Sequence, residues 1–207
     1  RSANSFNQPL DAWNVTAVTS LNFMFASNSG FNGQLNSWSL HSVASLSDVF
    51  SIATRFNQPL NSWNIGSAET LSNMFAGNYQ LNQPLYSWNT SSVYDMSSMF
   101  AAMTSTGFNQ PICSGDVSSV TTFFRMFEDS QAFGQNLCAW GAHYGSSNDY
   151  FQMFQPTTQC ESSEPQPSSP TTGWCAATCP ADTEAQCNAI VSTSILSHFA
   201  HLTIMRS

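Results

Sequence analysis

The chain has 207 residues and a formal net charge of −8, and its only lysine or arginine residues are four arginines. Charged residues make up 8% of the chain, against roughly 25% in average soluble proteins, so uncharged polar side chains must keep the surface wet. So few cations cannot neutralise a row of phosphates, which excludes nucleic acid and anionic membrane surfaces as partners.

A repeat runs through the first three quarters of the sequence. Its units open on Phe-Asn-Gln-Pro-Leu or a variant at residues 6, 31, 56, 81, 108 and 133, so the step is 25 residues four times and 27 once. A tryptophan follows seven residues after each start except in the fifth unit, which has Gly115. Such self-similarity is typical of stacked repeats. We therefore expect residues 1–155 to form a leucine-rich-repeat-like solenoid of about six coils.

The apolar spacing inside one unit suggests how a coil is built. Residues 10–15 alternate like a short parallel strand, and residues 18–25 have the three-residue spacing of a helical or 3-10 segment. One unit alone buries too little to fold, so its apolar side chains must stack on those of its neighbours. The predicted core columns are Trp13, Trp38, Trp63, Trp88 and Trp140, with Phe25, Phe50, Phe75, Phe100 and Phe127.

One asparagine recurs at the same place in five units, at Asn7, Asn32, Asn57, Asn82 and Asn109. We expect a ladder of amides that satisfies backbone groups of neighbouring coils, with a row of ligand-binding side chains as the alternative. The first five residues align with the loop at 26–30, so we also expect further repeats before residue 1.

The outward-facing residues of each predicted strand form a candidate binding face. They are small, polar and nearly uncharged, and include Asn14, Ser39, Asn64, Asn89 and Asp116. Protein hot spots favour Trp, Tyr and Arg, so carbohydrate, or solvent alone, suits this face better than tight protein recognition. Asn14 and Asn89 also stand in Asn-x-Ser/Thr glycosylation sequences, while Tyr86 and Tyr94 are candidate edge contacts. An ice-binding face would need a regular threonine array, which Thr16 and Thr90 do not supply.

The cysteines divide the rest of the chain. Residues 156–172, rich in Pro, Ser and Thr, are expected to form a linker or wrap, and residues 173–207 a disulfide-stapled cap without a membrane span. Cys113 and Cys138 share a unit position and are predicted to pair. The other four allow three pairings, and a zinc site with His198 and His201 is the alternative. Those four are Cys160, Cys175, Cys179 and Cys187.

The motif Leu10-x-x-Trp13-x-Val15-x-x-Val18-x-x-Leu21-x-x-Met24-Phe25, led by Phe-Asn-Gln-Pro-Leu, resembles the BspA-like surface-protein repeat. It is most similar to the form found in mycoplasma lipoproteins and some marine protists, over residues 1–154. The resemblance implies a right-handed leucine-rich-repeat-like solenoid on proteins of adhesion and binding, without catalytic residues. The fifth unit departs at Gly115 and at an insertion near 102–107, and the sixth at 142–148.

The acidic residues are scattered over different unit positions, and no phosphate loop or metal motif is present, so an enzyme is not expected. Six cysteines and two glycosylation sequences favour an extracellular or cell-surface location. The expected function is adhesion or binding without a cofactor, the partners being surface or matrix proteins, glycans or copies of the chain. The alternative is a structural building block of an extracellular filament or coat.

Overall fold

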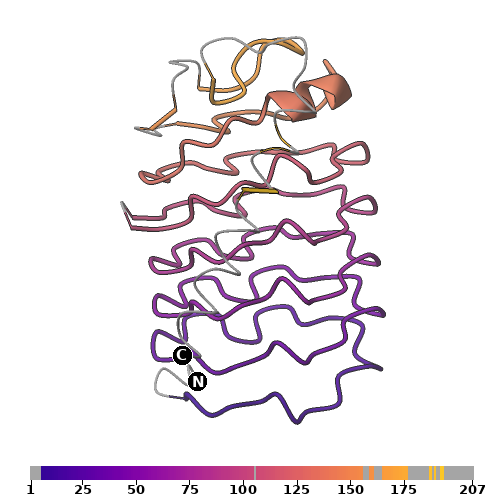
Figure 1. Ribbon diagram of the computed structural model, residues 1–207, viewed down its shortest axis with the longest axis vertical. Helices are drawn as coiled ribbons and strands as arrows, with labels where there is room; N and C mark the ends of the chain where they lie inside the picture. Colours follow the sequence, from indigo (N-terminus) through magenta and orange to yellow (C-terminus); the bar gives the residue numbers. More distant parts are fainter. Residues whose placement is uncertain are drawn as a thin grey trace.

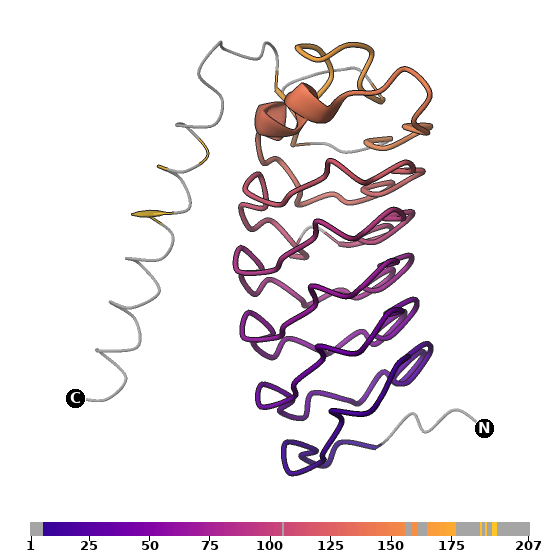
Figure 2. The same cartoon turned by 90° about the vertical axis from the view of Figure 1, so that its right-hand side faces the viewer.

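The computed structural model describes residues 6–104, 106–155, 159–160, 165–176, 187, 189 and 192–193. Successive turns of chain lie one above another along the long axis of the molecule (Figures 1 and 2). Within residues 6–176, as far as the structure describes them, the one helix is the 3-10 helix η1, Cys138–His143, in the sixth coil. The coils are therefore built almost entirely from turns.

Backbone hydrogen bonds join each coil to the next along one side. In the first coil alternate N–H groups donate upward: Leu21 to the Ser45 carbonyl, Phe23 to Ser47, Phe25 to Val49 and Ser27 to Ser51, at 2.7–3.1 Å. Parallel one-residue bridges continue the register, at Ser20, Ser45, Thr70, Asp95, Thr122 and Asp149. The inter-coil pairing thus lies at residues 19–27 of the first unit, and the strand expected at residues 10–15 is wrong.

Other N–H groups close turns inside each coil. Met24, Ala26 and Asn28 donate to the carbonyls three residues earlier, and so do Trp13 and Val18. Turns of this kind share the three-residue spacing of a 3-10 helix, which explains the helical expectation for residues 18–25. A helix does not form there because Phe23 and Ser27 have positive φ, 60° and 57°, which turns alternate N–H groups toward the next coil.

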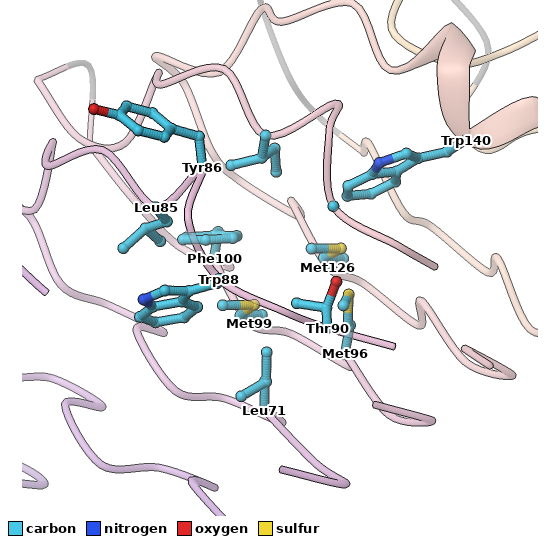
Figure 3. Close-up of a pocket in the computed structure, with 12 residues that line it drawn as sticks. Leu71, Leu85, Tyr86, Trp88, Thr90, Met96, Met99, Phe100, Met126 and Trp140 are labelled. Carbon is cyan, nitrogen blue, oxygen red and sulfur yellow. The ribbon is translucent and has the colours of Figure 1, made fainter. Parts of the chain in front are cut away.

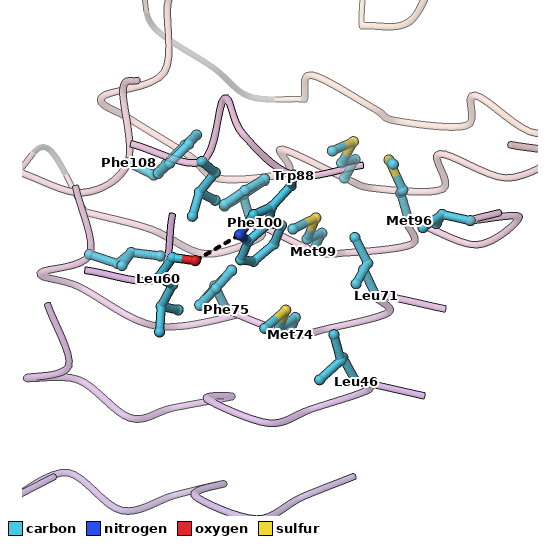
Figure 4. Close-up of a cluster of buried hydrophobic side chains, with 14 of the residues drawn as sticks. Leu46, Leu60, Leu71, Met74, Phe75, Trp88, Met96, Met99, Phe100 and Phe108 are labelled. Carbon is cyan, nitrogen blue, oxygen red and sulfur yellow. Dashed lines mark hydrogen bonds between the residues drawn. The ribbon is translucent and has the colours of Figure 1, made fainter. Parts of the chain in front are cut away.

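The core is a set of aromatic columns along the axis. Phe25, Phe50, Phe75, Phe100, Phe127 and Phe154 stack with ring centroids 5.4–5.7 Å apart. Trp38 stacks on Trp63 at 6.2 Å, and the Trp88 indole donates to the Leu60 carbonyl at 2.9 Å (Figure 4). Trp13, expected in this core, is instead 56% exposed, because the first coil has no described neighbour below it.

Asp48 is one of the residues with positive φ, and its partly buried carboxyl group can be tested by substitution. Its φ is 58°, and Asn73 holds the same place one coil later with φ 54°. Burial raises the pKa of Asp48 despite a hydrogen bond from Ser51, so this carboxyl group costs stability increasingly as the pH rises above its unfolded-state pKa. Asparagine carries no charge and tolerates positive φ well.

We therefore expect Asp48→Asn to stabilise the protein at pH 7 by roughly 0.5 kcal/mol, measured by urea unfolding. Below pH 3, where the unfolded and folded carboxyl groups are both protonated, the charge-dependent part of this gain should vanish. An equal or larger gain at low pH would show that charge burial is not its cause.

Residues 165–176 pack against the last coil. The Phe154 N–H donates to the Pro165 carbonyl at 2.8 Å, and the Gln152 N–H to the Gln166 side chain at 3.2 Å. Trp174 is fully buried, and its ring is nearly perpendicular to that of Tyr150, with the ring centroids 5.8 Å apart. Residues 165–176 thus receive two of the N–H groups that the last coil would otherwise leave open.

The predicted Cys113–Cys138 bridge is wrong. Cys113 pairs with Cys187, and Cys160 pairs with Cys175. Cys138 is also disulfide-bonded, while Cys179 lies outside the described residues. Equal unit positions did not suffice because η1 begins at Cys138 and changes the path of the sixth coil. Disulfides of this kind are typical of proteins from oxidising compartments.

Candidate functional site

The predicted binding face lies on the surface, and each of its five side chains takes part in a hydrogen bond within its own turn. The Asn14, Asn64 and Asn89 carboxamide oxygens each accept the N–H two residues ahead, at 3.1–3.2 Å. Asp116 accepts the Ser118 N–H at 2.9 Å, and Ser39 pairs with His41 at 3.1 Å. All five side chains are exposed. The row therefore consists of local turn-forming side chains on a solvated face.

Asp116 is the charged member of this row. The hydroxyl and N–H groups of Ser118 donate to its carboxylate and lower its pKa, and nearby His143 adds a smaller effect in the same direction. Asp116 is thus ionised at neutral pH and adds a local negative charge.

The two asparagines of the glycosylation sequences, Asn14 and Asn89, are both exposed.

The repeated asparagines form a continuous ladder. The Asn7 carboxamide oxygen accepts the Asn32 N–H at 2.7 Å, and the same bond recurs from each coil to the next up to Gly134, at 2.9–3.1 Å. Asn82 and Asn109 accept further bonds from Gln110 and Gln135 at 3.0 and 2.9 Å. The ladder satisfies backbone donors and presents a stripe of amides on one side of the coils.

Beside this stripe the surface is hollowed. The hollow has a volume of about 620 Å³ and is lined by Asn82, Thr106, Gly107, Asn109, Gln131, Ala132 and Gln159. None of these side chains is charged. Its size lies within the roughly 300–1,000 Å³ common for ligand pockets. The Asn82 and Asn109 carboxamide oxygens already accept two ladder bonds each, so these residues offer a polar, neutral ligand their N–H groups, and the glutamine carboxamides of the lining can supply acceptors.

The two-residue insertion that directly precedes residue 108, at the end of the fourth unit, forms one wall of this hollow. Thr104 and Thr106 donate through their hydroxyls to the Tyr79 carbonyl, at 3.2 and 3.5 Å. These bonds hold the inserted loop against the preceding coil, next to Tyr79, whose side chain is exposed. The chain thus has four residues between Met103 and Phe108 where regular units have two, and Thr106 and Gly107 are among these four.

Sequence reasoning found only part of this site. The repeat places Asn82 and Asn109 in the asparagine ladder, whereas it gives no reason to select Thr106, Gln131 or Gln159. The insertion near 102–107 was the one available signal. Gln159 comes from beyond the repeat, so no periodic pattern relates it to the others.

A second surface feature was also missed. Phe124 and Phe151 stack at 5.7 Å where earlier coils carry small polar residues, and the Arg125 guanidinium lies 5.0 Å from the Phe124 ring. Arg125 also pairs with Glu128 at 3.4 Å.

Of the tyrosines proposed as contacts, Tyr94 is exposed, while Tyr86 is half-buried.

The described residues contain no candidate metal cluster and no candidate membrane-spanning helix. No group of three or more His, Cys, Asp or Glu residues that could hold a metal occurs among them. His198 and His201, considered for zinc, lie outside the described part. In the same described part, no helix is long and apolar enough to cross a bilayer.

The comparisons with known proteins identify a family but no function. Residues 1–85 and 67–166 match the family described as "Mycoplasma protein of unknown function, DUF285". No curated protein and no solved structure matches the chain. The two matches together span residues 1–166 and contain the six units, which confirms the mycoplasma-type repeat. The chain belongs to the Mycoplasma DUF285 family.

Proposed function

We propose that the chain is a non-catalytic module of an extracellular or cell-surface protein and that it binds glycans in the amide-lined hollow. The observation that carries this proposal is that five of the seven lining residues are polar and none is charged; the polar ones are Asn82, Asn109, Gln131, Gln159 and Thr106. We also propose that its stacked coils are a leucine-rich-repeat-like solenoid of the BspA-like type. The aromatic columns and in-register asparagine ladder support that assignment.

The chemistry of the hollow suits a neutral sugar. A sugar presents closely spaced hydroxyls, each both donor and acceptor, and a carboxamide also presents both. A charged ligand finds no counter-charge among the lining residues. The open shape fits a chain or branch end that enters from solvent. A location outside the cell, which the disulfides favour, would bring the module into contact with glycans.

A glycan array probed with the purified chain tests this function, followed by titration calorimetry of the selected sugar. Gln131→Ala and Gln159→Ala should each weaken binding about 2- to 12-fold, the value of one hydrogen bond. Gln80→Ala is the matched control, an exposed amide outside the hollow, and should leave affinity unchanged. Absence of any neutral glycan ligand, or equal losses in all three variants, contradicts the proposal.

A structural building block is the second candidate, favoured by the lower face of the first coil. The carbonyl oxygens of Ser20, Asn22, Met24 and Ala26 accept no hydrogen bond from the described residues, although their equivalents in the next coil all do. Trp13 is exposed on the same coil. This face would accept another coil that offers N–H groups. Light scattering across a concentration series should then show growing assemblies, and a constant monomer mass counts against this candidate.

A further inference from the structure

Half of each carboxamide in the asparagine ladder is unused. The ladder oxygens, from Asn7 to Asn109, each accept the backbone N–H of the coil above. The Nδ2 atoms of the same five side chains donate no hydrogen bond to a described residue. Four of the five side chains are exposed, and Asn57 is half-buried. The ladder therefore offers one unused NH₂ group per coil at the surface.

A column of glutamines runs beside these NH₂ groups. Gln83, Gln110 and Gln135 each donate through Nε2 to the ladder asparagine of the coil below, at 2.9–3.1 Å. These bonds hold the glutamine carboxamides in place, and no described residue donates to their Oε1 atoms. Along this part of the stack each coil thus presents an uncharged donor and an uncharged acceptor.

The spacing of these groups is the spacing of the coils. Hydrogen-bonded neighbouring chains lie about 4.8 Å apart, and the ladder bond repeats once per coil. An extended peptide presents like-facing groups only at every second residue, about 6.7 Å apart, so it loses register within two coils. In an extended 1,4-linked polysaccharide each sugar advances by about one coil spacing. Every sugar also has oxygens on both edges, so a twofold alternation along the chain leaves no coil without an acceptor.

The gap in the tryptophan column is too small for a sugar. The fifth coil has Gly115 in place of a tryptophan, and the cavity there measures only about 40 Å³. Figure 3 shows the Trp88 and Trp140 rings on different sides of this space. One water molecule needs roughly 10–15 Å³, whereas ligand pockets usually exceed about 300 Å³. A sugar must therefore use polar groups at the surface.

We propose that the ligand of the hollow is a linear, uncharged polysaccharide of extended 1,4-linked sugars, which lies along the asparagine ladder. This inference rests on the proposed glycan-binding function and names the class of glycan. The hollow and the ladder are continuous, because Asn82 and Asn109 belong to both. From the hollow the polysaccharide passes Asn57, Asn32 and Asn7, one sugar for each coil. Each asparagine donates through its NH₂ group to a hydroxyl or ring oxygen.

Cello- and malto-oligosaccharides of two to six sugars are the probes, because both consist of 1,4-linked glucose and differ only in the configuration of the linkage. The first series is extended and the second coils. Chito-oligosaccharides share the extended backbone and carry an acetamido group on each sugar, so the tighter of the two extended series identifies the sugar. In that series titration calorimetry should show the hexasaccharide at least about 10-fold tighter than the disaccharide, since each further hydrogen bond contributes about 2- to 12-fold. The malto series should show no such gain.

Two variants assign this gain to the ladder. Asn32→Ala removes an NH₂ group outside the hollow, so it should weaken the hexasaccharide about 2- to 12-fold and leave the disaccharide unchanged. Asn64→Ala is the matched control, because Asn64 is also an exposed asparagine whose oxygen accepts one backbone N–H, but it lies in another row. It should leave both affinities unchanged. If Asn32→Ala does not fold, Asn7→Ala in the first coil makes the same comparison.

The outcomes separate this inference from the proposed function. Equal affinities for the hexasaccharide and the disaccharide, or for the extended and coiled isomers, overturn the inference and leave the hollow as a glycan site. Equal losses in the ladder variant and in Asn64→Ala do the same. Absence of any neutral glycan ligand overturns the proposed function and this inference together.

Discussion

Trp63→Ala is expected to lower the free energy of unfolding by about 3–5 kcal/mol, the usual cost of removing a buried tryptophan. The Trp63 side chain is 2% exposed and stacks on Trp38 at 6.2 Å. Its indole also donates to the Leu35 carbonyl, which ties the third coil to the second. The truncation therefore leaves a cavity and removes an inter-coil bond in the middle of the stack. Denaturant unfolding followed by circular dichroism measures the loss.

Trp13→Ala is the matched control, because it removes the same side chain from the same position of another unit. Trp13 is 56% exposed, so its truncation should cost less than about 1 kcal/mol. Equal losses for the two variants would mean that the coils do not bury the tryptophan column as the structure has it.

The Cys113–Cys187 disulfide is the second feature with a large expected effect. It joins residues 74 apart in sequence, and a loop of that length constrains the unfolded chain by about 4 kcal/mol. Replacement of both cysteines by alanine should therefore lower stability by up to that amount. The bond also fastens residue 187 to the fifth coil, far from the cap contacts at 165–176. Thermal unfolding of the double variant measures the effect.

The Cys160–Cys175 pair provides the comparison, because its residues are only 15 apart. The same loop argument gives about 3 kcal/mol for its removal, which should be the smaller of the two losses. Peptide mapping of the oxidised chain should recover Cys113 joined to Cys187. A peptide that joins Cys113 to Cys138, or a larger loss on removal of the 160–175 bond, would contradict the structure.

The repeat spacing predicted much of the local pattern but misplaced the backbone pairing. Apolar residues three apart suit a 3-10 segment and a run of turns equally, because both close hydrogen bonds between residues i and i+3. What separates them is the positive φ at Phe23 and Ser27, and neither residue type signals it. The alternation at residues 10–15 likewise gave no sign that these residues turn a corner, with the Trp13 N–H bonded to the Leu10 carbonyl.

The candidate site shows the same division. Asn82 and Asn109 could be found from the repeat alone, since equal spacing places them in one column. Gln159 could not, because it lies outside the repeat and reaches the hollow only through the path of the chain after the sixth coil. The pairing of Cys113 with Cys187 has the same origin, as residue 187 has no counterpart in any unit.

By itself, the amino-acid sequence determined which residues share a column, because units of equal length bring like residues above one another wherever they stack. The asparagine ladder and the phenylalanine column both follow that arithmetic. Only the tertiary structure decided which N–H groups point to the next coil, how the last coil is closed and where the surface is hollowed. These depend on backbone angles and on contacts between segments without a common period, and a residue pattern encodes neither.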